Sequence, residues 1–586
     1  MIRKLLSYVK QYRRAAVLTP VCMIGEVFME MLIPYVMASL IDRGIQAGNM
    51  GEIVKYGLIM LLCALCSLFF GVMGGRFAAQ ASTGFGANLR DGMYGNIQTF
   101  AFSNIDKFST AGLVTRMTTD VTNVQNAFQM VLRIAVRAPL TFITSIIMCF
   151  STSVRLSGIF MIAVAVLSCV LVLMMRVAMK RFSQVFARYD DVNASVQENV
   201  SAIRVVKSFV REDYESERFT KAATNLYNLF VRAEKAVVLN GPVMMITIYT
   251  CILLLSWLGA KYIVAGDLTT GQLTSLFSYV MSMLMSLMML SMIFVMITMS
   301  LASARRICEV LDEKAALTNP EHPVMRVENG AVDFNHVSFA YKSGSGEDTL
   351  KDIDLHIRSG ETIGIIGGTG SGKTSLVNLV SRLYDVTGGS VCVGGVDVRQ
   401  YDMEVLRNEV SVVLQKNVLF SGTILDNLRW GKEDATLEEC RGACRQAAAD
   451  DFIEAFPDGY ETRIEQGGSN VSGGQKQRLC IARALLKHPK VLILDDSTSA
   501  VDTATDARIR KAFRESIPGT TKLIIAQRIS SVQDADRILV LDNGRVHAFG
   551  THEELLERSE IYREIYETQT KGGGDFDQPG QGGAEA

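Results

Sequence analysis

Long hydrophobic runs dominate the first half of the chain. Six of them are long enough to cross a bilayer as helices, which takes about 20 residues each. They lie near residues 16–40, 53–75, 132–153, 156–179, 237–264 and 273–301. The pattern therefore predicts an all-α transmembrane domain with six spans, over residues 1–315.

The segments that connect these runs alternate between short and long. Residues 42–52, 152–155 and 265–272 are short connections, whereas residues 76–133 and 180–235 are long, polar and rich in Lys and Arg. The positive-inside rule puts the long connections and both termini in the cytosol, which makes this a multi-pass protein of the cell membrane.

Helical periodicity continues through both long connections, so the spanning helices should extend well beyond the bilayer. We expect them to turn near residues 104–112 and 201–211. Solvated hairpins are the alternative, but we favour docking of these tips on the soluble domain that follows on the same side. The basic amphipathic residues 1–14 are interpreted as a membrane-surface helix, because the following run is too long for a signal peptide.

Four charges fall inside the predicted spans: Glu26 and Glu30 in the first, Arg133 and Arg137 in the third. Each pair is spaced i, i+4 and shares one helix face. An unpaired charge near the bilayer centre costs about 2.5–3.5 kcal/mol. We therefore favour a carboxylate–guanidinium clamp between the two spans over an acidic patch for cationic cargo. For the methionine-rich residues 281–299, ordinary packing is favoured over a promiscuous apolar cavity.

The hydrophobic runs end near residue 311. The sequences Asp-Glu-Lys, Asn-Pro and His-Pro that follow mark a linker, which we place over residues 316–328. A soluble α/β domain is predicted over residues 329–570 and a disordered Gly-rich tail over 571–586. Strands are expected at 331–341, 362–366, 411–415, 491–495 and 522–527, with a mostly helical insertion at 422–486. Polar residues follow the carboxyl ends of these strands, which is where an α/β domain binds its ligand.

The central motif of this domain matches G-x-x-x-x-G-K-[ST] between a predicted strand and a helix. Its residues are Gly367, Gly368, Thr369, Gly370, Ser371, Gly372, Lys373 and Thr374. Glycines let a polyphosphate approach the backbone N–H groups, and the helix N-terminus is positive. Lys373 is expected to contact the β- and γ-phosphates, and Thr374 to ligate Mg²⁺ together with the carboxylates that end residues 491–496. Tyr341 is interpreted as a purine-stacking residue rather than a strand cap.

Composition agrees with two domains of different kinds. The chain has 586 residues, of which 49% are hydrophobic and 20% charged, and its formal net charge of −1 argues against nucleic acid as a partner. Eleven cysteines are scattered along the chain. Cys63 and Cys66 lie in an apolar run, where packing is favoured over a redox or zinc pair.

These motifs, in this order, resemble the ABC exporter family: a half-transporter with its membrane domain before its P-loop nucleotide-binding domain. After the glycine loop come a Q-loop residue, Gln415, a Walker B strand ending at Asp495, and a D-loop at residues 499–502 ending at Asp502. The signature motif comprises Val471, Ser472, Gly473, Gly474 and Gln475. The resemblance implies the type I exporter fold, and a dimer with two ATP molecules between the nucleotide-binding domains. It also implies Mg²⁺ at Thr374, Gln415 and Asp495, and coupling helices at the cytosolic tips.

The chain departs from the family pattern at the residues that serve hydrolysis. The family usually has Glu after Walker B, where this chain has Asp496, and a switch histidine where it has Gln527. Residues 465–468 depart from the usual Gly-Glu-x-Gly, and Val471 replaces the usual Leu. The side chain of Asp is one methylene shorter than that of Glu, which moves its carboxylate back by about 1 Å. A displacement of that size can lower the rate about 10²-fold.

The departures resemble the degenerate-site subunit of heterodimeric bacterial multidrug exporters. They imply a partner half-transporter with Glu and His at these positions. A homodimeric exporter and an ATP-gated channel or regulatory subunit are the alternatives. Small-molecule, lipid and peptide cargo all fit the sequence.

Overall fold

The computed structural model describes residues 1–341, 348–497 and 501–571. The chain divides into two compact units. One comprises Met1–Gln98 with Thr110–Glu313, and the other Thr99–Ser109 with Lys314–Ala586. Ser499 of the predicted D-loop and residues 572–586 of the predicted tail lie outside the described residues.

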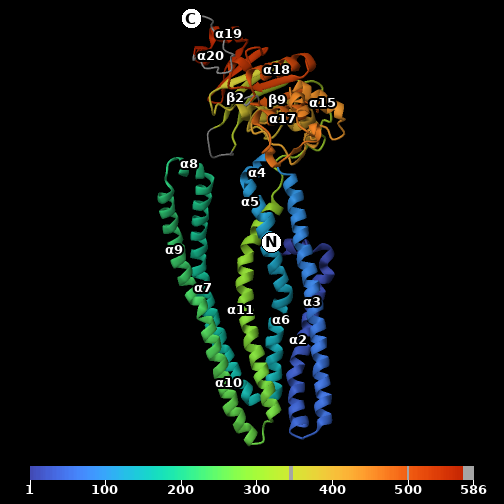
Figure 1. Ribbon diagram of the computed structural model, residues 1–586, viewed down its shortest axis with the longest axis vertical. Helices are drawn as coiled ribbons and strands as arrows, with labels where there is room; N and C mark the ends of the chain where they lie inside the picture. Colours follow the sequence, from blue (N-terminus) through green and yellow to red (C-terminus); the bar gives the residue numbers. More distant parts are fainter. Residues whose placement is uncertain (342–347, 498–500, 572–586) are drawn as a thin grey trace. The chain divides into compact units, whose positions relative to one another are not determined.

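The first unit consists of helices, many of them long (Figure 1). Their bounds are α1 Ile2–Ser7, α2 Arg13–Ser39, α3 Met50–Gln98, α5 Thr110–Thr115, α6 Val121–Thr152, α7 Val154–Ser201, α8 Ile203–Ser208, α9 Glu212–Val238, α10 Asn240–Val264 and α11 Thr270–Asp312. Six helical segments of the described chain are long and apolar enough to cross a membrane. The prediction of six spans is confirmed.

Several of these helices are far longer than a bilayer is thick. At 1.5 Å per residue, the 49 residues of α3 extend over about 73 Å, against a hydrocarbon core of about 30 Å. Helix α7 has 48 residues and α11 has 43. The prediction that spanning helices continue beyond the membrane is confirmed, and the short helix α8 forms the turn expected near residues 201–211.

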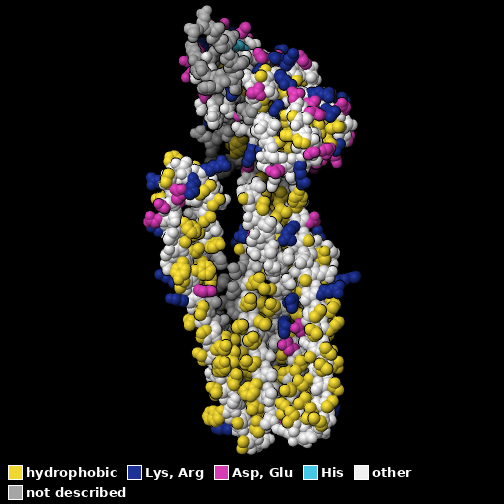
Figure 2. Space-filling model, viewed as in Figure 1, with side chains coloured by type: hydrophobic (Ala, Val, Ile, Leu, Met, Phe, Trp, Pro, Cys, Tyr) yellow, Lys and Arg dark blue, Asp and Glu magenta, His cyan; other side chains and the backbone are white. Residues whose placement is uncertain are grey.

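The helices of this unit pack in groups, α2 with α3, α6 with α11, and α7 with α9. Within the unit a hydrophobic cluster surrounds Tyr279 of α11, whose hydroxyl donates a 3.2 Å hydrogen bond to the Met31 carbonyl of α2. Figure 2 shows hydrophobic side chains covering the outer surface of α2, α10 and α11. Apolar residues on both the inner and outer surfaces are what a helix surrounded by lipid requires.

Helix α4 (Phe102–Phe108) belongs to the second unit. The side-chain amide of Asn104 accepts hydrogen bonds from the backbone N–H of Ala101 and Ala316 and donates one to the Lys314 carbonyl. The Tyr384 hydroxyl donates a 2.9 Å hydrogen bond to Asp106. Burial is the main cause that raises the pKa of Tyr384, and this hydrogen bond is the second. The first predicted tip therefore docks on the unit that contains the glycine loop.

The rest of the second unit alternates strands and helices. Strands are β1 Val332–Phe339, β2 Leu350–Ile357, β3 Thr362–Gly367, β4 Gly388–Val393, β5 Val396–Asp397, β6 Val410–Val413, β7 Gly422–Thr423, β8 Arg463–Ile464, β9 Val491–Asp495, β10 Thr521–Ile525, β11 Arg537–Asp542 and β12 Arg545–Gly550. Helices are α12 Lys373–Val380, α13 Met403–Glu409, α14 Ile424–Arg429, α15 Leu437–Gln446, α16 Asp450–Glu454, α17 Gly473–Leu485, α18 Thr503–Ser516, α19 His552–Arg558 and α20 Glu560–Lys571.

The main sheet of this unit has six strands in the order β12-β11-β3-β10-β9-β6, and all but β12 are parallel. Alternate residues of β9 enter opposite hydrophobic clusters: Leu492 and Leu494 on one face, Val491 and Ile493 on the other. Burial on both faces explains why these strands are continuous apolar runs. A second sheet, β2-β1-β4-β5, contains β2, an edge strand that the sequence interpretation did not identify.

Candidate functional site

The glycine loop leaves the middle of the main sheet. It joins β3 to α12, and β3 lies between β10 and β11. Because β9, β10 and β3 run parallel, their carboxyl ends meet at one edge, and Ile525 is level with both Ile365 and Asp495. The predicted placement of loop and carboxylates at this edge is observed.

Glycines are required in this loop for two separate reasons. Gly367 and Gly372 have φ angles of +153° and +97°, and a Cβ at Gly367 would lie 2.1 Å from the Leu541 carbonyl oxygen. Around Gly368, by contrast, a Cβ would meet no described atom within 4 Å, so its backbone faces open space. Gly367 and Gly372 therefore need glycine for the path of the backbone, whereas Gly368 leaves room for a ligand such as a phosphate group.

Lys373 and Thr374 begin α12 and lie against the loop and β9. The Lys373 ammonium donates hydrogen bonds of 2.8 Å to the carbonyls of Gly367 and Gly368. Burial lowers the pKa of Lys373, although the carboxylates of Asp495 and Asp496 oppose this shift. The Thr374 hydroxyl donates a 3.2 Å hydrogen bond to Asp495, and burial raises the pKa of that carboxyl. A hydroxyl beside a carboxylate offers the hard oxygen ligands that Mg²⁺ prefers, so these residues fit the ion.

Asp496 and Gln527 follow the ends of β9 and β10. The Gln527 amide donates a 2.7 Å hydrogen bond to Oδ2 of Asp496, whose own backbone has a φ of +50°. Both line a cavity of about 140 Å³ together with Val501, Thr503 and Asp506. The residues that stand in place of the family's catalytic Glu and switch His are therefore in direct contact.

Tyr341 is hydrogen-bonded to α12 just past the loop, whereas Gln415 follows the end of β6. The Tyr341 ring packs edge-on against Phe339 and Tyr384, and its hydroxyl forms a 2.8 Å hydrogen bond with Ser375. The ring is 47% exposed, which leaves a face available for stacking. Ser375, one residue past the motif, was not predicted. Gln415 lies two residues past β6 with an exposed side chain, and the expected strand over 411–415 ends at Val413.

The signature residues form the N-terminus of α17. The Ser472 hydroxyl accepts a 3.2 Å hydrogen bond from the Gln475 N–H, and the Gln475 side chain accepts one of 2.9 Å from the Ser472 N–H. Gly473 and Gly474 form the first turn. Among the described residues no hydrogen bond joins residues 472–475 to the glycine loop. Asp502 similarly caps α18 by accepting from the Thr505 N–H, which lowers the pKa of its carboxyl.

In the first unit, the predicted clamp is built around a single guanidinium. Arg137 of α6 donates hydrogen bonds of 2.8 Å to Glu26 and 2.9 Å to Glu30, one turn apart on α2. Arg133 is not part of it, since the described residues offer it no hydrogen bond or ion pair. The expectation of a clamp between the first and third spans is confirmed for Arg137 and wrong for Arg133.

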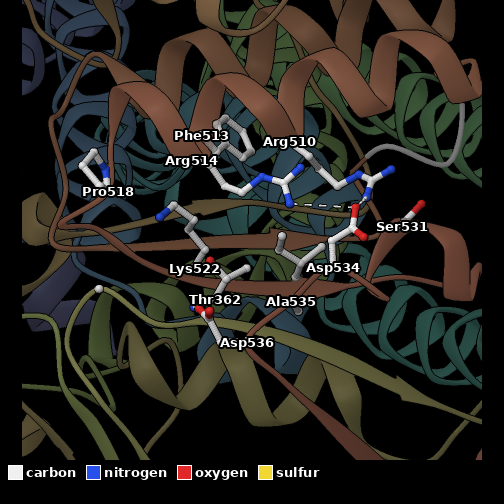
Figure 3. A pocket seen from close by; sticks show the side chains of 12 residues that line it. Thr362, Arg510, Phe513, Arg514, Pro518, Lys522, Ser531, Asp534, Ala535 and Asp536 are labelled. Carbon is white, nitrogen blue, oxygen red and sulfur yellow. Dashed lines mark hydrogen bonds and ion pairs between the residues drawn. The ribbon is translucent and has the colours of Figure 1, made fainter. Parts of the chain in front are cut away.

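A further cavity of about 170 Å³ in the second unit contains none of the predicted site residues (Figure 3). Arg510 and Arg514 of α18 pair with Asp534 at 3.1 Å and 3.9 Å. Lys522 of β10 also points into it, and burial lowers the pKa of this lysine. The arginines are neutralised by carboxylates, so we interpret this cluster as structural.

Comparisons with known proteins agree across both units. Residues 17–288 match the family described as ABC transporter transmembrane region, and residues 350–499 match ABC transporter. An uncharacterized ABC transporter ATP-binding protein of Bacillus subtilis, YfiB, is 36% identical, over 97% of this chain and 98% of its own. Rv1273c of Mycobacterium tuberculosis, described in the same words, is 35% identical over the same shares. A bacterial Atm1-family ABC exporter solved with ATP bound superposes with a TM-score of 0.81 and 23% identity, covering 96% of this chain and 99% of that one.

Proposed function

This chain belongs to the ABC transporter family as an ATP-driven exporter subunit with fused membrane and ATP-binding domains, and we propose that its own ATP site is degenerate. ABC half-transporters work as dimers. In the proposal the partner is a different half-transporter, which carries Glu and His where this chain has Asp496 and Gln527.

The groups that bind nucleotide are complete in this chain. Tyr341 would stack on the adenine, while the glycine loop and Lys373 would hold the phosphates. Thr374, Gln415 and Asp495 would hold Mg²⁺, which neutralises phosphate charge when bound. The 3.2 Å contact between Thr374 and Asp495 supports this assignment, because it brings two hard oxygen donors together.

The proposal rests on one observation, the hydrogen bond from Gln527 to Asp496. The carboxylate that should orient an attacking water accepts from an amide instead. Its side chain is also one methylene shorter than Glu, so the oxygen starts farther from the γ-phosphate position. A general base contributes about 10²–10⁴ in rate, and a misplaced one loses much of that factor. Hydrolysis at this site is therefore slow while ATP binding persists.

The signature residues are assigned to the partner's site. Ser472, Gly473, Gly474 and Gln475 form a helix N-terminus with a preorganised hydroxyl, a suitable group to contact a phosphate across a dimer interface. Asp502 would lie at the same interface. This chain thus completes a catalytic site that the other chain's Walker motifs begin.

We further propose that the protein lies in the cell membrane with both termini and the ATP-binding domain in the cytosol. Small molecules, lipids and peptides are the cargo classes that fit the membrane domain. A homodimeric exporter with slow catalysis and an ATP-gated channel are the competing functions.

The test uses the complex of this chain with its partner, reconstituted in liposomes. We expect uphill, ATP-dependent cargo movement, since an ATP-gated channel would give only downhill flux. Removing the partner's catalytic Glu should lower turnover by about 10²-fold or more, whereas Asp496→Ala should leave most of it. Substantial ATPase activity of this chain alone, lost in Lys373→Ala, would overturn the heterodimer and support the homodimer.

A further inference from the structure

A cavity of about 490 Å³ in the first unit lies between α2, α6 and α11. Its apolar wall consists mainly of methionine side chains: Met23 from α2, Met130 from α6, and Met289, Met292 and Met296 from α11. Methionine is unbranched and polarizable, so such a wall adapts to hydrocarbon groups of differing shape. Part of the methionine-rich sixth span thus lines a cavity, whereas its sequence had favoured ordinary packing alone.

Helix α6 supplies a polar stripe to the same cavity. Asn126, Gln129 and Arg133 follow one another at the i, i+3, i+7 spacing of one helix face, and all three line it. In the described part of the chain none of these three side chains has a hydrogen-bond partner. The Nε of Arg133 is buried without a partner. A buried donor without a partner is destabilising, and more so when it is charged, so a ligand that accepts from it is favoured.

The charge of the cavity lining is positive. Arg133 and Arg137 line it, and none of its described lining residues carries a carboxylate. Arg137 is already held by Glu26 and Glu30, whose side chains lie outside the lining. The net attraction for a ligand therefore comes from Arg133, and it favours an anion. This arrangement argues against the cationic cargo that the carboxylates alone would suggest.

The position of Arg133 along α6 agrees with an amphiphilic ligand. At 1.5 Å per residue it lies about 28 Å from the end of α6 at Thr152, which is close to the thickness of a hydrocarbon core. A headgroup bound there would lie at the boundary of the membrane, with its apolar part against the methionine wall. We propose that the cavity binds an amphiphilic anion, a phosphate or carboxylate with an apolar body, as cargo. The proposal rests on the exporter activity and not on the degenerate ATP site.

The test is native mass spectrometry of the full-length protein in non-ionic detergent without ATP, so failure of the degenerate-site proposal cannot affect it. Three probes with matched alkyl chains are titrated: phosphatidylglycerol, an alkyl phosphate and an alkyltrimethylammonium. We expect saturable binding of at least one anion and weaker binding of the cation. Arg133→Gln should weaken anion binding at least about tenfold, the equivalent of about 1.4 kcal/mol.

Two further variants separate a binding role from a structural one. Arg133→Lys keeps the charge and should retain most of the anion affinity. Arg76→Gln removes an exposed arginine of α3 that lies outside the cavity lining, and it should leave anion binding unchanged. Preference for phosphatidylglycerol identifies a lipid as the source of the anion, and preference for the alkyl phosphate identifies a soluble amphiphile. Unchanged anion affinity in Arg133→Gln, or equal binding of the cation, would overturn the proposal.

Discussion

The side-chain amide of Gln527 donates a hydrogen bond of 2.7 Å to the carboxylate of Asp496. Asp496 directly follows β9 and Gln527 follows the neighbouring strand β10, so the bond depends on the register of these two strands. Asp496 is 8% exposed, so the carboxylate that accepts this bond is largely shielded from water. The departures at Asp496 and Gln527 thus form one structural pair and should be reversed together.

Reversing that pair should restore hydrolysis. The double variant Asp496→Glu with Gln527→His should raise the ATPase rate of the purified chain at least about tenfold, because a longer carboxylate reaches the water and a histidine can carry charge. Asp496→Glu alone should give a smaller gain, since Gln527 would still bind the carboxylate. Adding Lys373→Ala to the double variant is the control and should abolish the gain. A double variant as slow as the natural chain would contradict the pairing.

The clamp in the first unit should appear as energetic coupling between two helices. Glu26→Gln and Arg137→Gln should each lower the melting temperature, and the double variant should lose less than their sum. The coupling expected for such a contact is about 0.5–3 kcal/mol. Arg133→Gln is the matched control, because Arg133 lies one turn away and should show no coupling to Glu26.

Additive effects of Glu26→Gln and Arg137→Gln would contradict the clamp. So would a Glu30→Gln protein of unchanged yield and melting temperature that loses transport of cations alone, since that result would give the carboxylates a role in cargo binding.

Docking of α4 should depend on Asn104. Asn104→Ala removes the partner of the Ala101 and Ala316 N–H groups and of the Lys314 carbonyl, and each unsatisfied group costs about 1–3 kcal/mol. We expect faster hydrogen exchange at the backbone amides of residues 101 and 316. Ser103→Ala changes an exposed neighbour on the same helix and should leave both rates unchanged. Equal exchange in the two variants would show that Asn104 does not hold α4.

The buried ammonium of Lys522 should destabilise the second unit at pH values below the alkaline range. Burial lowers its pKa, so the unfolded chain binds more protons there and stability rises as pH increases from the folded pKa toward the unfolded one. Lys522→Met should raise the melting temperature at pH 7 by about 2–4 °C, as about 1 kcal/mol does in a domain of this size, and should flatten this rise.

The control for Lys522 is Lys511→Met on α18, whose lysine is exposed. It should change neither the melting temperature nor its pH dependence. A lower melting temperature for Lys522→Met would mean that the ammonium has a stabilising partner in solution.

Features that depend on local sequence could be predicted. The glycine loop needs particular backbone angles and open space, and Asp495 ends a strand that is apolar on both faces, so each leaves a pattern within a few residues. The six spans also follow from run length alone. Strand β2 was missed because its apolar positions alternate with charged ones in a polar segment at the edge of a sheet.

Features that depend on helix rotation or strand register could not be predicted. The spacing of Glu26 and Glu30 indicated one helix face, but only the packing of α2 on α6 selects Arg137 and leaves Arg133 in the cavity. The same holds for Gln527 and Asp496, which are separated by 31 positions and meet through strand pairing. The docking role of Asn104 gave no signal, because its partners across the unit, the Lys314 carbonyl and the Ala316 N–H, are backbone groups more than 200 positions away.

We propose above all that this chain binds ATP and hydrolyses it slowly at its own site. The most direct measurement is the identity of nucleotide held at that site in the two-chain complex, after incubation with radiolabelled ATP and Mg²⁺ and removal of unbound nucleotide. Lys373→Ala marks the fraction of label that belongs to this site. We predict that this fraction remains ATP over many turnovers of the complex and becomes ADP in the Asp496→Glu, Gln527→His variant. Recovery of ADP from this site in the natural chain, at the rate of overall turnover, would contradict the account.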